Sequence, residues 1–240
     1  MYDNATATLD DSISAADVPA SEIAPHADWT DMNRTDHFVQ IYESDSFLVR
    51  SVAEYVIHGI RTGETCIVVA TPEHRQAIKE LVTQFCAELN TTDRYIELDA
   101  RETLVKFACE KLDRTLFDEV IGGLVRHAAA RGPVRIFGEM VALLLADGRA
   151  ADSLHLEDMW NVLQQELPFS LFCAYPSSEM LRSGSEDFME GVCSGHSRVI
   201  PDETYTSLAS EDRLKRIAVL LQRNRQLEAE LARLDSRVAA

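Results

Sequence analysis

The sequence predicts an α/β protein in which helices cover both faces of a mostly parallel central sheet, as a three-layer sandwich. The first observation is that short β-branched segments alternate with longer amphipathic segments. Parallel strands need such crossovers, and these are right-handed. The second is that several short segments are apolar throughout, which is typical of strands covered on both faces. The third is an apolar content of 46% over 240 residues, enough for one domain with a substantial core.

Each expected element follows from its local pattern. Strands are expected at residues 38–41, 65–70, 95–98, 134–137 and 169–174. Helices are expected at residues 47–61, 72–89, 101–111, 116–130 and 141–166. Pro72 suits the first turn of its helix, where a backbone N–H has no intrahelical partner to lose. The run Arg131-Gly132-Pro133 ends a helix, and Asp147-Gly148 interrupts the longest one.

The turn between the first strand and the first helix reads Tyr42-Glu43-Ser44-Asp45-Ser46. In a nucleotide-binding sheet this turn carries glycines, which let the backbone approach the phosphates, and a lysine, which meets their charge. The turn in this chain has no glycine and no lysine, and it brings an aromatic hydroxyl and two carboxylates instead. The sequence therefore predicts a nucleotide-binding type of sheet whose phosphate loop has been lost.

Composition narrows the classes of partner and the compartment. A formal net charge of −17 gives no electrostatic basis for binding DNA or an anionic membrane surface, so neither is predicted. The five cysteines form no C-x-x-C pair, which favours reduced thiols. The N-terminus lacks the basic and apolar regions of a signal peptide, and no apolar stretch is long enough to span a membrane. We expect a cytoplasmic protein.

Three regions are expected along the chain. Residues 1–36 are acidic and without sustained periodicity, which predicts a disordered leader, and residues 37–200 form the domain. Residues 201–240 are expected to form a linker and a coiled-coil helix. Its apolar seam, with one polar position, is Ile217, Leu220, Asn224, Leu227, Leu231, Leu234 and Val238. A polar residue at an a position favours a parallel homodimer. The alternative is a single amphipathic helix that packs on its own domain.

Candidate site residues are sought at the carboxyl ends of the strands, because ligands of open α/β sheets bind there. The polar or aromatic residues at these ends are Tyr42, Glu43, Glu73, His74, Asp99, Glu139 and Tyr175. Glu139 is the strongest candidate, since its carboxylate follows a buried strand where nucleotide-binding sheets hold a metal-coordinating acid. A structural salt bridge is the alternative for Glu139. A capping or surface role is the alternative for His37 and His74.

A second set of candidates lies in the last predicted helix and strand. Glu157 and Trp160 share a helix face and could line a pocket, although an indole at this spacing is more typical of a core residue. Cys173 lies in an apolar strand, which favours a buried thiol over a nucleophile.

Metal and catalytic signatures are absent from the linear sequence. Residues of metal-ligating type include His155, Glu157, Cys173 and His196. They show none of the H-x-x-x-H, H-E-x-x-H or C-x-x-C spacings, so no metal site is predicted. The G-x-S-x-G elbow of serine hydrolases is also absent, and the protein is predicted not to be an enzyme.

Five segments together resemble the MEDS family, a sensory domain described from methanogens, methylotrophs and the dichloromethane-responsive regulator. They are DHFVQIY at 36–42, GETCIVVATP at 63–72, RIFGEM at 135–140, LEDMWN at 156–161 and FCAYP at 172–176. The resemblance covers about residues 36–200. It implies a degenerate RecA-like ATPase domain, related to the circadian-clock ATPases, that has lost its phosphate loop and senses small molecules.

The resemblance also implies a ligand pocket. The residues that match the characteristic positions of the family are His37, Tyr42, Glu139, Glu157 and Tyr175. Members are often joined to histidine kinase, response regulator or DNA-binding modules, whereas this sequence shows no helix-turn-helix and no kinase. We therefore expect a non-enzymatic sensor that binds a small molecule at the strand ends and signals through a dimeric coil to a partner regulator or kinase. No cofactor is identified. The alternatives are a residual nucleotide-binding or hydrolytic enzyme that uses Glu139, and a protein-interaction scaffold.

Overall fold

The computed structural model describes residues 29–88, 94–183 and 185–203. Its centre is a six-stranded sheet in which every pair of neighbouring strands is parallel, in the order β3-β2-β4-β5-β1-β6. The strands are β1 (His37–Tyr42), β2 (Thr65–Ala70), β3 (Tyr95–Asp99), β4 (Val134–Gly138), β5 (Ser170–Pro176) and β6 (Arg198–Ile200). The predicted α/β class and parallel sheet are confirmed, and β6 is an addition that the sequence pattern did not predict.

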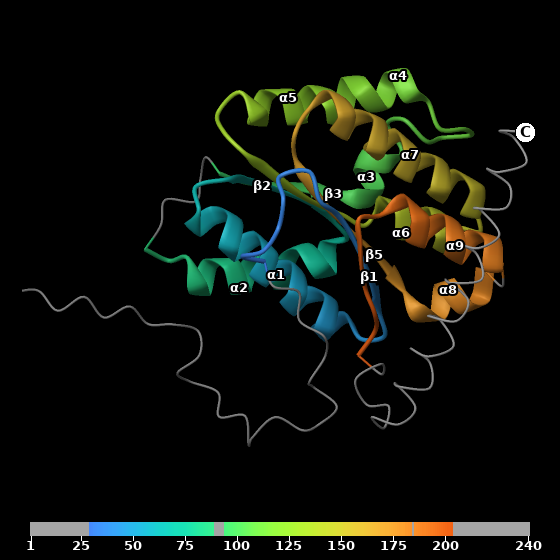
Figure 1. The fold of residues 1–240 in the computed structure, drawn as a ribbon, viewed down its shortest axis with the longest axis horizontal. Helices are drawn as coiled ribbons and strands as arrows, with labels where there is room; N and C mark the ends of the chain where they lie inside the picture. The colour runs from blue at the N-terminus through green and yellow to red at the C-terminus, as the bar shows by residue number, and fades with distance from the viewer. Residues whose placement is uncertain (1–28, 89–93, 184, 204–240) are drawn as a thin grey trace, which may run out of the picture. The chain divides into compact units, whose positions relative to one another are not determined.

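Helices cover both faces of the sheet (Figure 1). One face is covered by α1 (Asp45–Arg61) and α2 (Pro72–Phe85). The helices of the rest of the described chain are α3 (Ala100–Leu104), α4 (Arg114–Phe117), a π-helical turn (Asp118–Gly122), α5 (Gly123–Ala129), α6 (Met140–Ala146), α7 (Ala150–Glu166), α8 (Ser177–Ser183) and α9 (Glu186–Gly195). In Figure 1, α4, α5 and α7 lie on the side of the sheet opposite α1 and α2.

Local chemistry sets where several helices begin and end. Ser44, in the turn without a phosphate loop, caps α1 by accepting a hydrogen bond from the backbone N–H of Phe47. Asp99 caps α3 in the same way, which is the capping role typical of an aspartate at this position. Gly148 separates α6 from α7 with a φ of 75°, a left-handed conformation that glycine adopts without steric cost. The predicted interruption at Asp147-Gly148 is therefore confirmed.

One predicted helix is much shorter than expected. The pattern predicted a helix over residues 101–111, but α3 ends at Leu104. The backbone N–H groups of Lys106 and Phe107 bond back only three residues, which tightens the chain into a turn. This turn buries Phe107 edge-on against Phe117, so the tertiary contact overrides the helical pattern.

Strand alternation divides the core into two parts. On the α1 side, Phe38 and Phe172 pack with Tyr55 and Trp29. Trp29 is buried, so the packed part of the chain begins within residues 1–36, the segment whose composition predicts a leader. On the other side, Trp160 is buried against Phe117 and Phe169 as a core residue.

The predicted coiled coil and the remainder of the leader lie outside the described residues. Within the described residues, no helix combines the length and the apolar character needed to cross a membrane.

Candidate functional site

The first polar group of interest surrounds Glu157, which α7 places against the sheet. The Glu157 side chain is only 4% exposed. Tyr175 of β5 donates a hydrogen bond from its hydroxyl to Glu157 Oε1 at 2.9 Å, and the Cys173 thiol donates to Oε2 at 3.4 Å. The Tyr175 hydroxyl also lies 3.0 Å from the Ser153 hydroxyl. Cys173 and Tyr175 point to the same face of the sheet because they are two residues apart in one strand.

Two histidines complete this group. His37, the first residue of β1, places its Nε2 atom 3.4 Å from Glu157 Oε2 and 3.4 Å from Cys173 Sγ. His196 follows α9 and places its Nε2 atom 3.4 Å from Glu157 Oε1. The two imidazole rings are 4.0 Å apart between centroids. We refer to His37, Glu157, Cys173 and His196 as the buried cluster.

In both histidines, Nδ1 is hydrogen-bonded to an oxygen atom. His37 Nδ1 lies 2.9 Å from Asn161 Oδ1, and the Asn161 amide nitrogen donates to the carbonyl of Gly195. That second bond orients the amide, so its oxygen faces His37 and Nδ1 is the donor. His196 Nδ1 lies 2.6 Å from the carbonyl oxygen of Val192, which can only accept, so this Nδ1 also carries a proton. Both histidines therefore direct Nε2 at Glu157.

The charges of the buried cluster are coupled. Burial alone raises the pKa of Glu157, but the nearby imidazoles of His196 and His37 together lower it well below its usual range, so Glu157 is a carboxylate. Burial opposes protonation of His196, yet Glu157 and the Val192 carbonyl together raise its pKa. Burial, followed by the negative charge of Glu157, raises the pKa of both Cys173 and Tyr175, so both are protonated.

The second polar group lies at the carboxyl ends of β1, β2 and β4. Glu139 follows β4, and its Oε2 atom accepts a hydrogen bond of 2.6 Å from the backbone N–H of Thr71. Its Oε1 atom pairs with His74 Nδ1, while His74 Nε2 lies 3.4 Å from Asp45. The Tyr42 ring meets the His74 ring edge-on at 6.5 Å. We refer to Tyr42, Asp45, His74 and Glu139 as the edge cluster.

Negative charge dominates the surroundings of the edge cluster. Burial, followed by the charges of Glu139, Asp45 and Glu179, raises the pKa of Tyr42, which stays protonated. The hydrogen bond from His74 to Glu139 raises the pKa of His74. This arrangement offers hydrogen-bond acceptors and an aromatic face, and it repels a polyphosphate.

The predicted pocket residues fall into these two groups. His37, Glu157 and Tyr175 lie together at the buried cluster, whereas Tyr42 and Glu139 lie together at the edge cluster. Alternation in β1 is the reason, because it points His37 and Tyr42 to opposite faces of the sheet. The sequence placed Tyr42, Glu139 and Tyr175 at the carboxyl ends of strands, and Glu157 in a helix. In the structure all three lie there, but the Tyr175 hydroxyl bonds Glu157 and not the edge cluster.

Sequence reasoning missed one partner and one grouping. His74 was considered alone, and nothing in the sequence paired it with Glu139. Three of the residues considered as metal ligands, Glu157, Cys173 and His196, do converge, with His37 as the fourth member. His155 instead lies exposed on α7. Linear spacing could not reveal this grouping, because its members come from β1, α7, β5 and the segment after α9.

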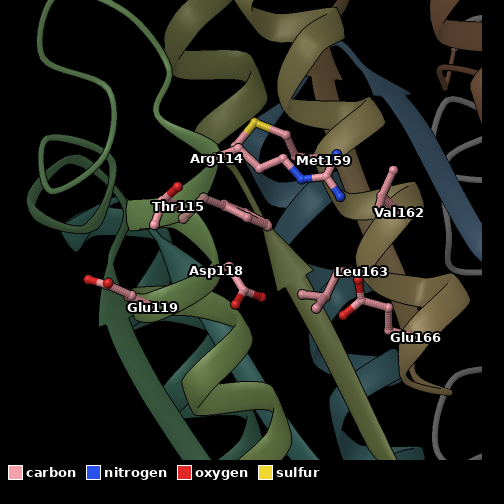
Figure 2. A pocket seen from close by; sticks show the side chains of 9 residues that line it. Arg114, Thr115, Asp118, Glu119, Met159, Val162, Leu163 and Glu166 are labelled. Atoms are coloured by element: carbon pink, nitrogen blue, oxygen red, sulfur yellow. The ribbon is translucent and has the colours of Figure 1, made fainter.

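A surface hollow of about 440 Å³ lies between α4, the π-helical turn and the C-terminal half of α7 (Figure 2). Its lining residues are Arg114, Thr115, Phe117, Asp118, Glu119, Met159, Val162, Leu163 and Glu166. The lining combines charged side chains of both signs with apolar side chains. None of the predicted site residues contributes to it.

Comparison with known proteins places the sequence that forms these clusters in a family. None of the curated proteins compared with the chain matches it. The family model for MEDS, the methanogen/methylotroph, DcmR sensory domain, matches residues 36–196. The match spans more than half of the chain and includes every member of both clusters. The chain therefore belongs to the MEDS family of sensory domains.

Proposed function

We propose that this chain is a signalling sensor without enzymatic activity, which binds a small organic molecule beside the edge cluster. Membership of a sensory-domain family supports the signalling role. Fold alone does not determine the function, so the site must carry the rest of the proposal. The single observation that carries it is the contact of Glu139 with Thr71 and His74 at the strand ends.

The edge cluster favours a particular class of ligand. A phosphate loop would present backbone N–H groups and a lysine here, but the turn presents Tyr42 and Asp45, and Glu139 already occupies the N–H of Thr71. Carboxylates beside an aromatic face favour a small molecule with a hydrogen-bond donor or a positive charge next to an apolar part. We therefore propose a small amine or alcohol rather than a nucleotide.

The output of the sensor is proposed from the sequence pattern. The heptad seam with Asn224 favours a parallel homodimer, and the coil then passes a change in spacing or register to a partner regulator or kinase. A ligand can drive such a change only if it binds the two states with different affinity.

A thermal-shift screen of the full chain with small amines, alcohols, carboxylates and ATP with Mg²⁺ tests the proposal. We expect amines or alcohols to raise the Tm of the wild-type chain, and Tyr42→Leu and Glu139→Gln to abolish the shift. Glu73→Gln is the matched control, because Glu73 is an exposed carboxylate on α2 and should keep the shift. If no compound gives a shift that depends on Tyr42 or Glu139, the proposal fails.

One observation favours the enzymatic alternative. Glu139 and His74 are in direct contact, and a carboxylate that holds a histidine is a common acid–base pair. The same screen separates the two functions. Micromolar binding of ATP with Mg²⁺ that Glu139→Gln abolishes would favour a residual nucleotide enzyme over a sensor of small organic molecules.

A further inference from the structure

We infer that the buried cluster is a binding site for one divalent transition-metal ion, with Zn²⁺ as the first ion to test. The proposed ligands are Nε2 of His37 and His196, Sγ of Cys173 and a carboxylate oxygen of Glu157. This inference is independent of the proposed sensing function, because it uses no residue of the edge cluster.

The chemistry of the donors fits such an ion. Imidazole nitrogen, thiolate sulfur and carboxylate oxygen are the three donor types that proteins use for Zn²⁺, and four of them make a closed tetrahedral site. The soft thiolate disfavours Mg²⁺ and Ca²⁺, which prefer oxygen. Cys173 as thiolate and Glu157 as carboxylate together balance the charge of a divalent ion, which matters in a site where both residues are buried.

The spacing of three of the four donor atoms fits one face of a tetrahedral site. The four donor atoms lie within 4.8 Å of one another. Three of them, His37 Nε2, Cys173 Sγ and Glu157 Oε2, form a triangle whose three sides are each 3.4 Å. Metal–ligand bonds of about 2.0–2.3 Å at tetrahedral angles give ligand-to-ligand distances of roughly 3.3–3.8 Å. The nitrogen-to-oxygen separation between His37 and Glu157 also exceeds the distance of about 2.9–3.0 Å that is usual for N–H···O hydrogen bonds.

The hydrogen bonds of the two Nδ1 atoms leave both Nε2 atoms available as metal ligands. Nδ1 of each histidine donates to an oxygen, so Nε2 of the neutral ring carries the lone pair. His196 Nε2 is buried and makes no hydrogen bond within the described structure, although it points at Glu157. Histidine ligands in metal sites are held in this way by a carbonyl or amide on the opposite nitrogen. Asn161 and the carbonyl of Val192 would therefore be positioning groups.

Binding of the ion to the metal-free cluster exchanges protons for metal–ligand bonds. Without metal, the Glu157 carboxyl group lies between the two imidazoles, and the Cys173 thiol donates a hydrogen bond to it. Binding of the ion forms bonds to two nitrogens, one sulfur and one oxygen. The S–H proton of Cys173 leaves to solvent, as does any proton that Nε2 of either histidine carries. No oxidation or reduction is involved.

The test uses the full chain with the accessible thiols Cys109 and Cys193 replaced by serine. The protein is produced in medium containing Zn²⁺ or Co²⁺ and purified without chelator. We expect about one ion per chain, and in the Co²⁺ form a sulfur-to-cobalt charge-transfer band with the intense visible bands of tetrahedral cobalt. The band requires a thiolate ligand, so this measurement is decisive without any change at the site.

Variants then assign the ligands. Cys173→Ser should remove the charge-transfer band, and His196→Gln should remove most of the bound metal. Asn161→Leu should weaken binding about 10- to 100-fold while keeping the band, because it removes the groups that orient His37 and hold the Gly195 carbonyl beside His196 but leaves every ligand in place. The matched controls are Cys66→Ser, a buried thiol from β2, and His127→Gln, an exposed histidine. Both should bind metal as the parent does.

Two results would overturn the inference. The parent chain could carry no Zn²⁺ or Co²⁺ after growth in either metal. Alternatively, it could carry metal without a charge-transfer band, which would place the ion elsewhere.

Discussion

The buried cluster and the edge cluster use the same residue types in different surroundings. In each, a glutamate whose side chain is 4% exposed contacts histidine. The histidine partners of Glu157 are themselves 0–4% exposed, whereas Glu139 shares His74 with Asp45, whose side chain is 77% exposed. Both glutamates are thus covered, but only the edge cluster has a member in water.

This difference separates two roles. A buried charge whose partners are all buried has no water to replace a lost partner, so its contacts are costly to break. A covered charge with a partner in water can exchange that partner for a ligand at lower cost. The buried cluster is therefore suited to hold elements together, and the edge cluster is suited to respond to what is in solution.

The largest expected effect is on the buried cluster. In the chelator-treated chain, Glu157→Gln should lower the free energy of unfolding by about 3–5 kcal/mol, because it removes the charge of a buried carboxylate that four buried side chains contact. Glu139→Gln should cost less, about 1.5–3 kcal/mol, since water reaches the edge cluster. Urea denaturation followed by circular dichroism measures both. Equal losses would remove the distinction between the clusters.

A smaller effect is expected for Tyr175→Phe. This change removes the hydroxyl that bonds Glu157 and Ser153, at a cost of about 1–3 kcal/mol. Tyr95→Phe is the matched control, because the Tyr95 hydroxyl is buried without a hydrogen-bond partner within the described residues. That control should be neutral or slightly stabilising. A loss at Tyr95 as large as that at Tyr175 would show that the bonds to Glu157 add no stability.

The smallest expected effect is that the edge cluster makes the stability of the fold depend on pH. The pKa of His74 is raised in the folded chain, chiefly by its hydrogen bond to Glu139. Its stabilising contribution is therefore fully present below the unfolded pKa of about 6.5, and is lost as the pH rises through the higher folded value. Solvent screening limits the effect to about 1 kcal/mol or less.

Unfolding measured at intervals between about pH 6 and pH 9 should show this loss in the wild-type chain and not in His74→Gln. Asp45→Asn should reduce it only slightly, because Asp45 is exposed and 3.4 Å from His74. An unchanged pH profile in His74→Gln would assign the dependence to another group.

Much of the fold could be predicted because its signals are local. The strongly β-branched β2 and the proline at the start of α2 are visible in the sequence, and both lie where they were expected. The short strand β6 could not be predicted, because Arg198–Ile200 is extended only through its pairing with β1. The RecA-like relationship and the C-terminal coiled coil remain predictions.

The site was harder to predict than the fold. Residue types indicated Glu139, Glu157 and Tyr175 as candidates, but the face of each side chain depends on register and on which helix packs above it. His196 illustrates the limit. It contacts Glu157 only because α9 folds back onto α7, and no spacing in the sequence records that contact.

The position of β1 has a mechanical consequence. This single strand carries His37 at its first residue and Tyr42 at its last, and it is hydrogen-bonded between β5 and β6. The parallel ladder joins Gln40 to Ile200, the last residue of β6, from which the chain continues toward its C-terminal segment. The six residues of β1, rising about 3.3 Å each, thus connect both polar clusters to the end of β6. Backbone pairing and the Ser197 hydroxyl, which bonds the backbone of His37, couple β1 to β6, so the two strands would move together.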